Sequence, residues 1–244
     1  MRLIVITIET FFDGEAASVN LLFENGLETL HLRKPFASRH ETMDFIRLIN
    51  TDYHSRIVLH DHYDLAELLN LRGIHLNRRN QGTKVGCNTG TNFGYNMETN
   101  VDYNQGTLVG CNSDIHKEDK NVFLEKRILS VSRSCHSLED IKVSSDCDYV
   151  FLSPVFDSIS KIGYKQGFTP EQLHDAKRSK LINGNVIALG GLTAKNIPVA
   201  HHYGFGGVAV LGSLWSDFPA NGNESELLKR FIELKIACEK HLSC

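Results

Sequence analysis

The stretch that decides the fold is VIALGGLTAKNIPVAHHYGFGGVAVLGSL, residues 186–214. It contains two short apolar runs, 186–189 and 207–211, separated by a longer amphipathic segment over 194–202. Short apolar runs beside glycines predict β-strands, and the amphipathic segment between them predicts a helix. Because two parallel strands need such a crossover, the whole stretch predicts a parallel β-α-β unit.

The same alternation extends over the rest of the chain. Eight short runs rich in Val, Ile and Leu are apolar along nearly their whole length, as strands buried on both faces should be. The predicted strands are 3–8, 29–33, 56–60, 73–76, 128–132, 149–153, 186–189 and 207–211. The predicted helices are 15–25, 39–50, 63–70, 137–144, 170–181, 194–202 and 225–240. Thr169 is expected to cap the helix whose first turn contains Pro170.

This order predicts an α/β protein, a single (β/α)8 TIM barrel that takes in residues 1–244 as one domain. A length of 244 residues lies within the range of about 200–250 that such barrels occupy. An open sheet is disfavoured because no GxGxxG or GxxxxGK[ST] phosphate loop follows any predicted strand. One long insertion, 77–127, separates the fourth strand from the fifth.

The insertion is rich in Asn, Gly and Thr, which predicts a long loop with at most a weak helix over 113–126. Within it, NQGTKVGCN (80–88) recurs as NQGTLVGCN (104–112), the single difference being Lys84 against Leu108. A repeat of this kind suits either a metal or ligand module or a recent tandem duplication in a tolerant loop. We favour the duplication.

Composition excludes several classes of protein. With 41% hydrophobic and 23% charged residues, the chain is globular rather than disordered. A net charge of −3 argues against a strongly basic nucleic-acid binder. No run reaches the ~18 apolar residues that span a membrane, and residues 1–15 lack the features of a secretory signal. We therefore expect a cytoplasmic protein with small-molecule partners, without nucleic-acid or membrane partners, and with homo-oligomerisation left open. The six cysteines form no CxxC pair and are expected to be free thiols.

In such a barrel the active site lies at the carboxyl ends of the strands, and the loops after strands seven and eight often hold a phosphate. Gly190 and Gly191 follow the seventh predicted strand, and Gly212 follows Leu211 at the end of the eighth. Unobstructed backbone N–H groups at both places predict a phosphate site. Glycines also make tight β-α turns, so for either loop taken alone this simpler role stays open.

Two further sets of residues at the strand ends suit anions. Ser158, Ser160 and Lys161 offer hydroxyls and a cation for a second phosphate or a pyrophosphate, unless they form only a solvated polar loop. Arg33, after the second strand, suits a carboxylate or a phosphate, with a surface ion pair as the alternative.

Histidines supply the candidates for proton transfer and metal binding. His136 lies just beyond the fifth strand, where it would transfer protons near neutral pH, although a lone histidine is often structural. His60 and His62 flank Asp61 and would share a face of an extended chain. A metal site there is conceivable but lacks a further carboxylate nearby.

Several motifs in this order resemble the thiamine phosphate synthase/TenI family of barrels over nearly the whole chain except the 77–127 loop. They are HLRK (31–34), HDHYDLA (60–66), GIHL (73–76), DYVFLSPVFDSISK (148–161), VIALGGLT (186–193) and GFGGVAVLGSL (204–214). The synthase branch joins a hydroxymethylpyrimidine pyrophosphate to a thiazole phosphate with Mg2+ and loss of pyrophosphate. The TenI branch includes a tautomerase that aromatises thiazole carboxylate phosphate by moving a proton, without a cofactor.

The resemblance implies roles for individual residues. It assigns the synthase's pyrophosphate contacts to Ser158, Ser160 and Lys161, and the backbone donors for the thiazole phosphate to Gly191, Leu211 and Gly212. Ser132 corresponds to a serine of the fifth strand, and Asp61 to one of two Mg2+-binding aspartates. The segment SRSCHSLED (132–140) is similar to the one that carries the tautomerase's histidine, here His136.

The departures from the family pattern favour the tautomerase. No carboxylate stands within 77–80, where the second metal aspartate is expected, and His31 and Pro35 replace the Gln and Lys of the strand-two motif. His60 replaces an Asn. Release of pyrophosphate needs that negative charge neutralised, whereas a proton shift needs only an acid/base group and an anchored phosphate. The synthase is the alternative, and a non-catalytic ligand sensor of the same pathway is a third hypothesis.

Overall fold

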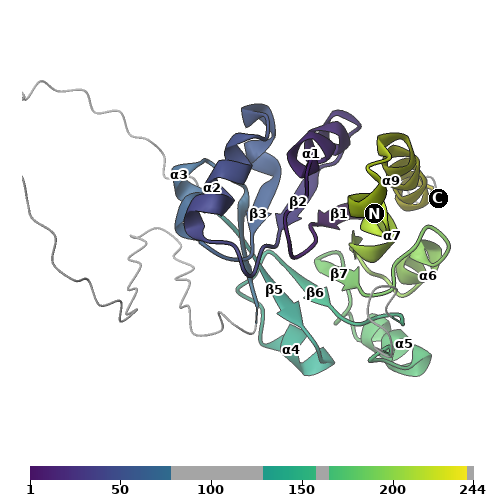
Figure 1. The fold of residues 1–244 in the computed structure, drawn as a ribbon. Coiled ribbons are helices and arrows are strands. Elements are labelled where there is room, and N and C mark those ends of the chain that lie inside the picture. The colour runs from purple at the N-terminus through teal and green to yellow at the C-terminus, as the bar shows by residue number, and fades with distance from the viewer. Residues whose placement is uncertain (78–128, 158–164, 241–244) are drawn as a thin grey trace, which may run out of the picture. The chain divides into compact units, whose positions relative to one another are not determined.

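The computed structural model describes residues 1–77, 129–157 and 165–240, and these residues form a closed barrel of eight parallel strands in sequence order. Strand β8 pairs with β1 and closes the barrel, and the helices lie around it (Figure 1). The prediction of a (β/α)8 barrel is confirmed. Apart from Asn77, the 77–127 insertion lies outside the described residues, so its repeat, its weak helix and the single-domain assignment stay predictions.

The strands are short and the helices vary in length. The strands are β1 Arg2–Ile6, β2 Thr29–Leu32, β3 Ile57–Leu59, β4 Gly73–Leu76, β5 Ser130–Cys135, β6 Tyr149–Leu152, β7 Val186–Leu189 and β8 Gly207–Val210. The helices are α1 Glu15–Glu24, α2 Arg39–Arg47, α3 Asp64–Leu68, α4 Leu138–Lys142, α5 Pro170–Arg178, α6 Ile197–His202, α7 Gly212–Trp215, α8 Phe218–Asn221 and α9 Glu224–Glu239, with a 3-10 helix at Thr51–Arg56. In the described part of the chain, no helix combines the length and the apolar character that a membrane crossing needs.

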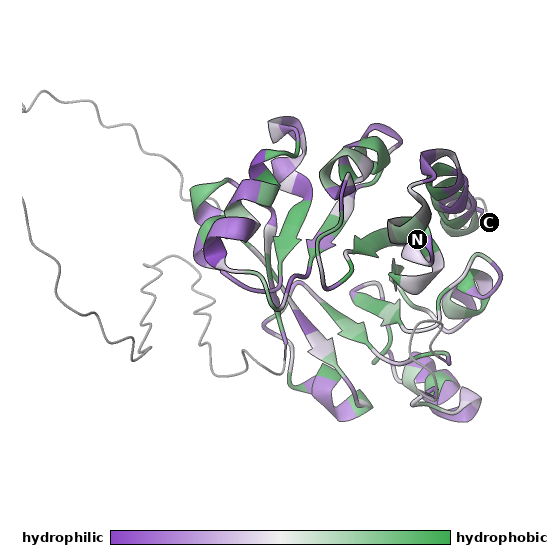
Figure 2. Ribbon diagram, in the orientation of Figure 1, coloured by the Kyte–Doolittle hydropathy of each residue, from purple (hydrophilic) through white to green (hydrophobic). Residues whose placement is uncertain are grey.

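The interior of the barrel is divided between apolar and polar side chains. Side chains of β1, β6, β7 and β8 form an apolar cluster of Ile4, Ile6, Tyr149, Phe151, Ile187 and Ala209. On the other side, buried polar residues of β2, β4 and β5, such as His31, His75 and Ser132, take the inward positions. The difference is visible in the hydropathy colours, where β7 is largely hydrophobic and β5 is the palest and most hydrophilic strand (Figure 2).

Strand β5 was predicted in the wrong place. The apolar run Ile128–Ser132 suggested that the strand ends at Ser132, whereas β5 extends to Cys135, and Cys135 lies opposite Leu152 of β6. Its sequence SVSRSC is polar, yet the inward serine hydroxyls find hydrogen-bond partners inside the barrel. Ser132 is therefore a mid-strand residue of the interior rather than a residue of the rim.

Helix starts and ends follow local capping. Thr169 accepts a hydrogen bond from the Gln172 N–H, and Pro170 begins α5, as the sequence predicts. Helix α6 begins at Ile197 rather than at residue 194. The Asn196 side-chain oxygen accepts a hydrogen bond from the Thr193 N–H, which forms a turn before the helix. The predicted 39–50 helix ends at Arg47 and is followed by the 3-10 helix.

The described cysteines are free thiols, as expected. Cys135 and Cys238 are buried and Cys147 is partly exposed. Burial raises the pKa of both Cys147 and Cys238 to about 11, which keeps these thiols protonated and unreactive at neutral pH.

A buried ion pair fixes the start of α1 beneath the β2–α2 loop. The Lys34 ammonium lies 2.6 Å and 2.7 Å from the two carboxylate oxygens of Glu15, and both side chains are at most 2% exposed. The ammonium also donates to the Thr10 carbonyl and lies 4.6 Å from the centre of the Phe11 ring. Burial raises the pKa of Glu15 and lowers that of Lys34, so each charge depends on the other.

Replacing Glu15 with Gln should lower the free energy of unfolding by about 3–5 kcal/mol, because the Lys34 charge would stay buried without a counterion. The double variant Glu15→Leu/Lys34→Met should recover most of that loss. Urea unfolding curves measure both effects. The half-exposed Arg39–Asp64 pair is the control, since Asp64→Asn should cost less than about 1 kcal/mol. A Glu15→Gln effect no larger than that of Asp64→Asn would contradict the prediction.

Candidate functional site

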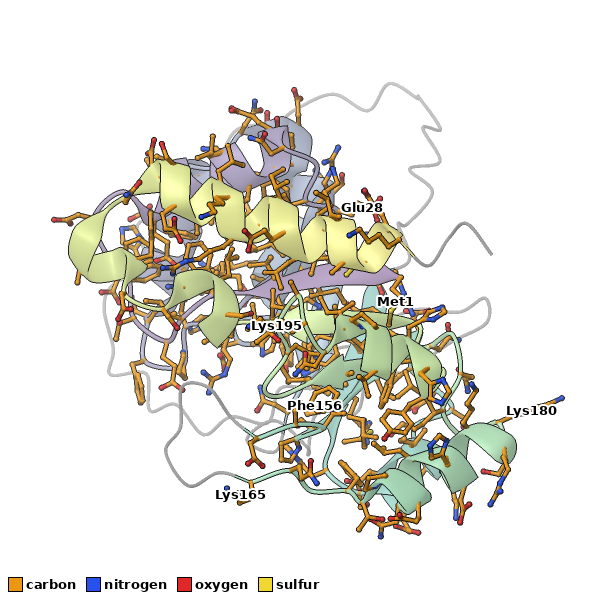
Figure 3. All side chains as sticks on the ribbon, turned by 90° about the vertical axis from the view of Figure 1, so that its right-hand side faces the viewer. Met1, Glu28, Phe156, Lys165, Lys180 and Lys195 are labelled. Carbon is orange, nitrogen blue, oxygen red and sulfur yellow. The ribbon has the colours of Figure 1, made fainter. Side chains whose placement is uncertain are left out.

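All eight strands run the same way, so their carboxyl ends meet at one end of the barrel, which we call the rim. In Figure 3, Phe156 and Lys165 of the β6–α5 connection and Lys195 of the β7–α6 connection lie toward this end. Met1 and Lys180 lie toward the opposite end. The rim therefore brings together residues that are far apart in the sequence.

The loop after β7 takes a backbone conformation that only glycine adopts easily. Gly190 and Gly191 have φ values of 100° and 64°, in the left-handed region. A Cβ on Gly191 would lie 2.2 Å from the Asp157 carbonyl oxygen, and one on Gly190 would lie 2.9 Å from Pro154 Cα. The glycines thus make a tight turn against the β6–α5 loop. This observation supports the simpler role but is compatible with anion binding as well.

Asn196 holds this turn in place, although the sequence did not single it out. Its side-chain amide donates to the Gly191 carbonyl at 2.8 Å, and its oxygen accepts from the Thr193 N–H at 2.8 Å. Because the Gly191 carbonyl is held by Asn196, the turn keeps a fixed orientation at the rim. An Asn that follows a Gly-Gly pair by five residues is a sequence signal for a side chain that hydrogen-bonds back to the turn.

The loop after β8 carries a polar group that lacks a partner. Helix α7 begins at Gly212, and the Ser213 hydroxyl oxygen is buried with no hydrogen-bond partner among the described residues. A buried hydroxyl in this state costs free energy unless another group hydrogen-bonds to it. Since β7 and β8 are paired, with Leu189 opposite Ala209, the turn at Gly191 and the turn at Gly212 are neighbours.

His136 lies directly after β5 and is oriented by its neighbours. Its ring Nδ1 is 3.3 Å from both the carbonyl oxygen and the hydroxyl of Ser153, which follows β6. A carbonyl only accepts, so that contact favours a proton on Nδ1 and leaves Nε2 with a lone pair. The His136 backbone N–H donates to Asp140 at 2.8 Å, and this bond is the main reason why the pKa of Asp140 is lowered.

The charged residues after β2 and β3 are partly engaged. Arg33 Nη1 donates a hydrogen bond to the Glu9 carboxylate at 2.7 Å. This ion pair uses one of the five N–H groups of the guanidinium, and the Arg33 side chain is 29% exposed. The expectation that His60 and His62 share a face is wrong. His62 has a φ of 53° and its Nε2 contacts the Ala37 carbonyl at 2.8 Å, whereas His60 is buried.

His60 belongs instead to a hydrogen-bonded network inside the barrel, together with His31 and His75. His31 Nδ1 lies 2.9 Å from His60 Nε2, and His31 Nε2 lies 2.7 Å from the Tyr149 hydroxyl. His75 contacts the hydroxyls of Ser132 and Ser134, each at 2.8 Å. Ser132 also hydrogen-bonds to Tyr149, so it connects the two halves of the network.

Sequence reasoning missed His75 and did not see that the three histidines meet. The available signal was their position, since each lies at the end of, or at an inward position in, one of three consecutive strands. Burial lowers the pKa of His31 far below its ordinary value, and it lowers that of His75 to about 3. Both imidazoles are therefore neutral.

Two parts of the predicted site have different outcomes. Ser158, Ser160 and Lys161 lie outside the described residues, so their roles stay predictions. Asn77 stands where the resemblance expects the region of the second metal aspartate, and its side-chain amide donates to the His60 carbonyl at 3.1 Å. Residues 78–80 are Arg, Arg and Asn, so the sequence offers no second aspartate at this place. These residues do not fit a two-aspartate Mg2+ site.

Comparisons with known proteins relate the chain to thiamine biosynthesis. Residues 109–214 match the family described as thiamine monophosphate synthase. The structure of a thiamine phosphate pyrophosphorylase from Bacteroides thetaiotaomicron matches with 34% sequence identity and a TM-score of 0.73, covering 99% of each chain. No curated protein matches the chain.

More distant structures show the fold alone. A thiamine phosphate pyrophosphorylase from Pyrococcus furiosus is 19% identical, with a TM-score of 0.62 over 98% of this chain and 96% of that one. A mutant tryptophan synthase α-subunit from Pyrococcus furiosus is 15% identical, with a TM-score of 0.53 over 96% of this chain and 97% of that one.

The lowered pKa values of His31 and His75 predict a loss of stability in acid. In the unfolded chain their pKa is about 6.5, whereas in the folded chain it is lowered, to about 3 for His75. Below pH 6.5 the unfolded state therefore binds protons that the folded state does not, so stability decreases as the pH falls from about 6.5 toward 3. His31 and His75 each contribute up to about 1.4 kcal/mol per pH unit in this range.

The variant His75→Gln should lose stability less steeply than the wild type between pH 6.5 and pH 5, in urea unfolding measured with a chelator present. The exposed His202 supplies the control, because His202→Gln should keep the wild-type slope. Equal slopes for His75→Gln and the wild type would show that His75 is not held neutral by burial.

Proposed function

The chain belongs to the thiamine phosphate synthase/TenI family of thiamine biosynthesis, and from this premise we propose that it is a TenI-like thiazole tautomerase. The proposed substrate is thiazole carboxylate phosphate, and the product is its aromatic tautomer. The reaction removes a proton from one ring position and returns a proton to another, so it needs one acid/base group and no redox partner.

The observation that carries the proposal is the placement of His136. It follows β5 directly at the rim, and the Ser153 contact to Nδ1 leaves Nε2 as the basic nitrogen. A neutral imidazole in this tautomer accepts a proton at Nε2 and can give it back to the substrate at a second atom. Asp140 supports the arrangement, because its carboxylate accepts hydrogen bonds from the backbone N–H groups of His136 and of Ser137, the N-cap residue of α4.

The phosphate would be held on the other side of the rim by the loops after β7 and β8. Gly190 and Gly191 shape the first loop, while Leu211 and Gly212 form the second. The unpartnered Ser213 hydroxyl supports a ligand at this place, since a phosphate oxygen would accept its hydrogen bond. An anchored phosphate fixes the ring relative to the acid/base group, which is the main contribution of binding to such a reaction.

Arg33 is the proposed contact for the substrate carboxylate. It lies at the rim after β2, and its ion pair with Glu9 orients the guanidinium while leaving further N–H donors. Ser132 is not proposed as a direct substrate contact, because it is buried in mid-strand and bonded to His75.

Replacing His136 with Gln should reduce kcat by about 10²–10⁴-fold with little change in KM, because the proton acceptor is lost while the phosphate site is kept. Ultraviolet absorbance of the aromatic thiazole and mass spectrometry follow the reaction. The rim variant His62→Gln is the matched control and should retain wild-type turnover. Unchanged turnover in His136→Gln would contradict the assignment.

The alternative is thiamine phosphate synthase, which the position of Asp61 after β3 and the Ser-x-Ser-Lys sequence of residues 158–161 favour. It would join hydroxymethylpyrimidine pyrophosphate to the thiazole phosphate with Mg2+. The missing second aspartate argues against it, and we expect no pyrophosphate release at high enzyme concentration when both substrates and Mg2+ are supplied. Release that depends on Mg2+ and is abolished in Asp61→Asn would establish the synthase instead. Tight ligand binding without either reaction would indicate the ligand sensor.

A further inference from the structure

Three imidazoles lie together inside the barrel, apart from the proposed acid/base group. His31 is on β2, His60 follows β3 and His75 is on β4, so they come from three neighbouring strands. One ring nitrogen from each lies within 4.8 Å of those of the other two. All three side chains are buried, with at most 4% exposure.

His31 and His60 are oriented as metal ligands would be, whereas both ring nitrogens of His75 contact serine hydroxyls. His31 Nδ1 and His60 Nε2 face each other at 2.9 Å, so a single proton lies between two lone-pair directions that converge. The opposite nitrogen of His31 is held by the Tyr149 hydroxyl, and His75 is held by the Ser132 and Ser134 hydroxyls. Metal-binding histidines are oriented by such hydrogen bonds through the nitrogen that does not bind the ion.

We propose that His31, His60 and His75 form a binding site for a borderline divalent transition-metal ion, with Zn2+ as the reference ion. Imidazole nitrogen suits Zn2+, Co2+, Ni2+ and Cu2+, whereas Mg2+ prefers oxygen ligands. The site is therefore different in chemistry from the two-aspartate Mg2+ site of the synthases. Three protein ligands leave a fourth position open, as in sites where zinc binds water or a substrate.

Binding requires a small local rearrangement. Zn–N bonds of about 2.0–2.1 Å in a tetrahedral site place ligand nitrogens about 3.3 Å apart. The His31–His60 pair, at 2.9 Å, is already close to this distance. His75 now stacks on His60 with ring centres 4.2 Å apart, so its ring has to turn and give up one of its two serine contacts.

The proton and charge balance is compatible with this arrangement. When the ion replaces the proton between His31 and His60, that proton moves to the other nitrogen of the same ring. In His31 this nitrogen then donates to Tyr149. The nearby positive charge of Arg33 is offset by Glu9, and the Asp61 carboxylate is adjacent to His60 in the chain. The Phe151 ring, whose centre lies 4.7 Å from the ring centres of His31 and His75, packs against the site as an apolar wall.

The test is a titration of the full-length, chelator-treated protein with Co2+, followed by competition with Zn2+. We expect one equivalent of Co2+ to produce visible absorption bands typical of nitrogen ligation, and Zn2+ to abolish them and raise the Tm. His60→Gln and His75→Gln should each weaken Co2+ binding by at least about 100-fold. Tyr149→Phe keeps all three ligands and should weaken binding by about 10–100-fold while preserving the spectrum.

Two controls make the result decisive. His202→Gln should bind Co2+ like the wild type, because His202 is exposed and outside the cluster. Circular dichroism and thermal unfolding establish that each variant is folded, and if His75→Gln does not fold, His60→Gln and Tyr149→Phe decide. The absence of one-equivalent binding would overturn the proposal, and so would wild-type affinity in His60→Gln and Tyr149→Phe. In either case the cluster is a hydrogen-bonded network only.

Discussion

The pairing of β8 with β1 is the constraint on which the rest of the structure depends. Arg2 to Val5 lie opposite Gly207 to Val210, and this ladder turns a row of strands into a closed barrel. A Cβ at position 207 would lie 2.8 Å from the Arg2 carbonyl oxygen, so glycine permits the close approach. Once the barrel is closed, all strand ends meet at one rim. Residues far apart in the sequence, such as Arg33 after β2 and Gly212 after β8, then follow strands that end at the same rim.

Closure also decides what fills the interior. The side with β1, β6, β7 and β8 is packed with apolar side chains, while β2 to β5 contribute histidines and serines whose polar atoms must find partners. The network through His31, Tyr149, Ser132 and His75 meets that requirement with neutral side chains. Because His31 and His75 are neutral, each keeps one nitrogen lone pair, which accepts a hydrogen bond in the network and would bind the ion in the proposed site.

Much of the fold could be predicted from the sequence, because strands buried on both faces are short apolar runs. Val186–Leu189 and Gly73–Leu76 have the predicted bounds. Strand β5 could not be placed in this way, because its sequence SVSRSC is polar. Its serines can lie inside the barrel only because His75 forms hydrogen bonds with their hydroxyls. The meeting of three histidines was equally hidden, since it depends on the register of β2, β3 and β4. His136 was singled out from its place beyond the fifth strand, although that strand ends at Cys135 rather than at the predicted Ser132, and its acid/base role stays a proposal.

The tight packing of Gly190 and Gly191 against Pro154 and Asp157 has a mechanical consequence. A Cβ on Gly191 would lie only 2.2 Å from the Asp157 carbonyl oxygen, so the turn after β7 packs directly against the segment that follows β6. Val155 and Phe156 also donate backbone hydrogen bonds to Leu189 and Gly190. Neither segment can shift without displacing the other. A ligand bound by one of these two segments would therefore restrain the other as well.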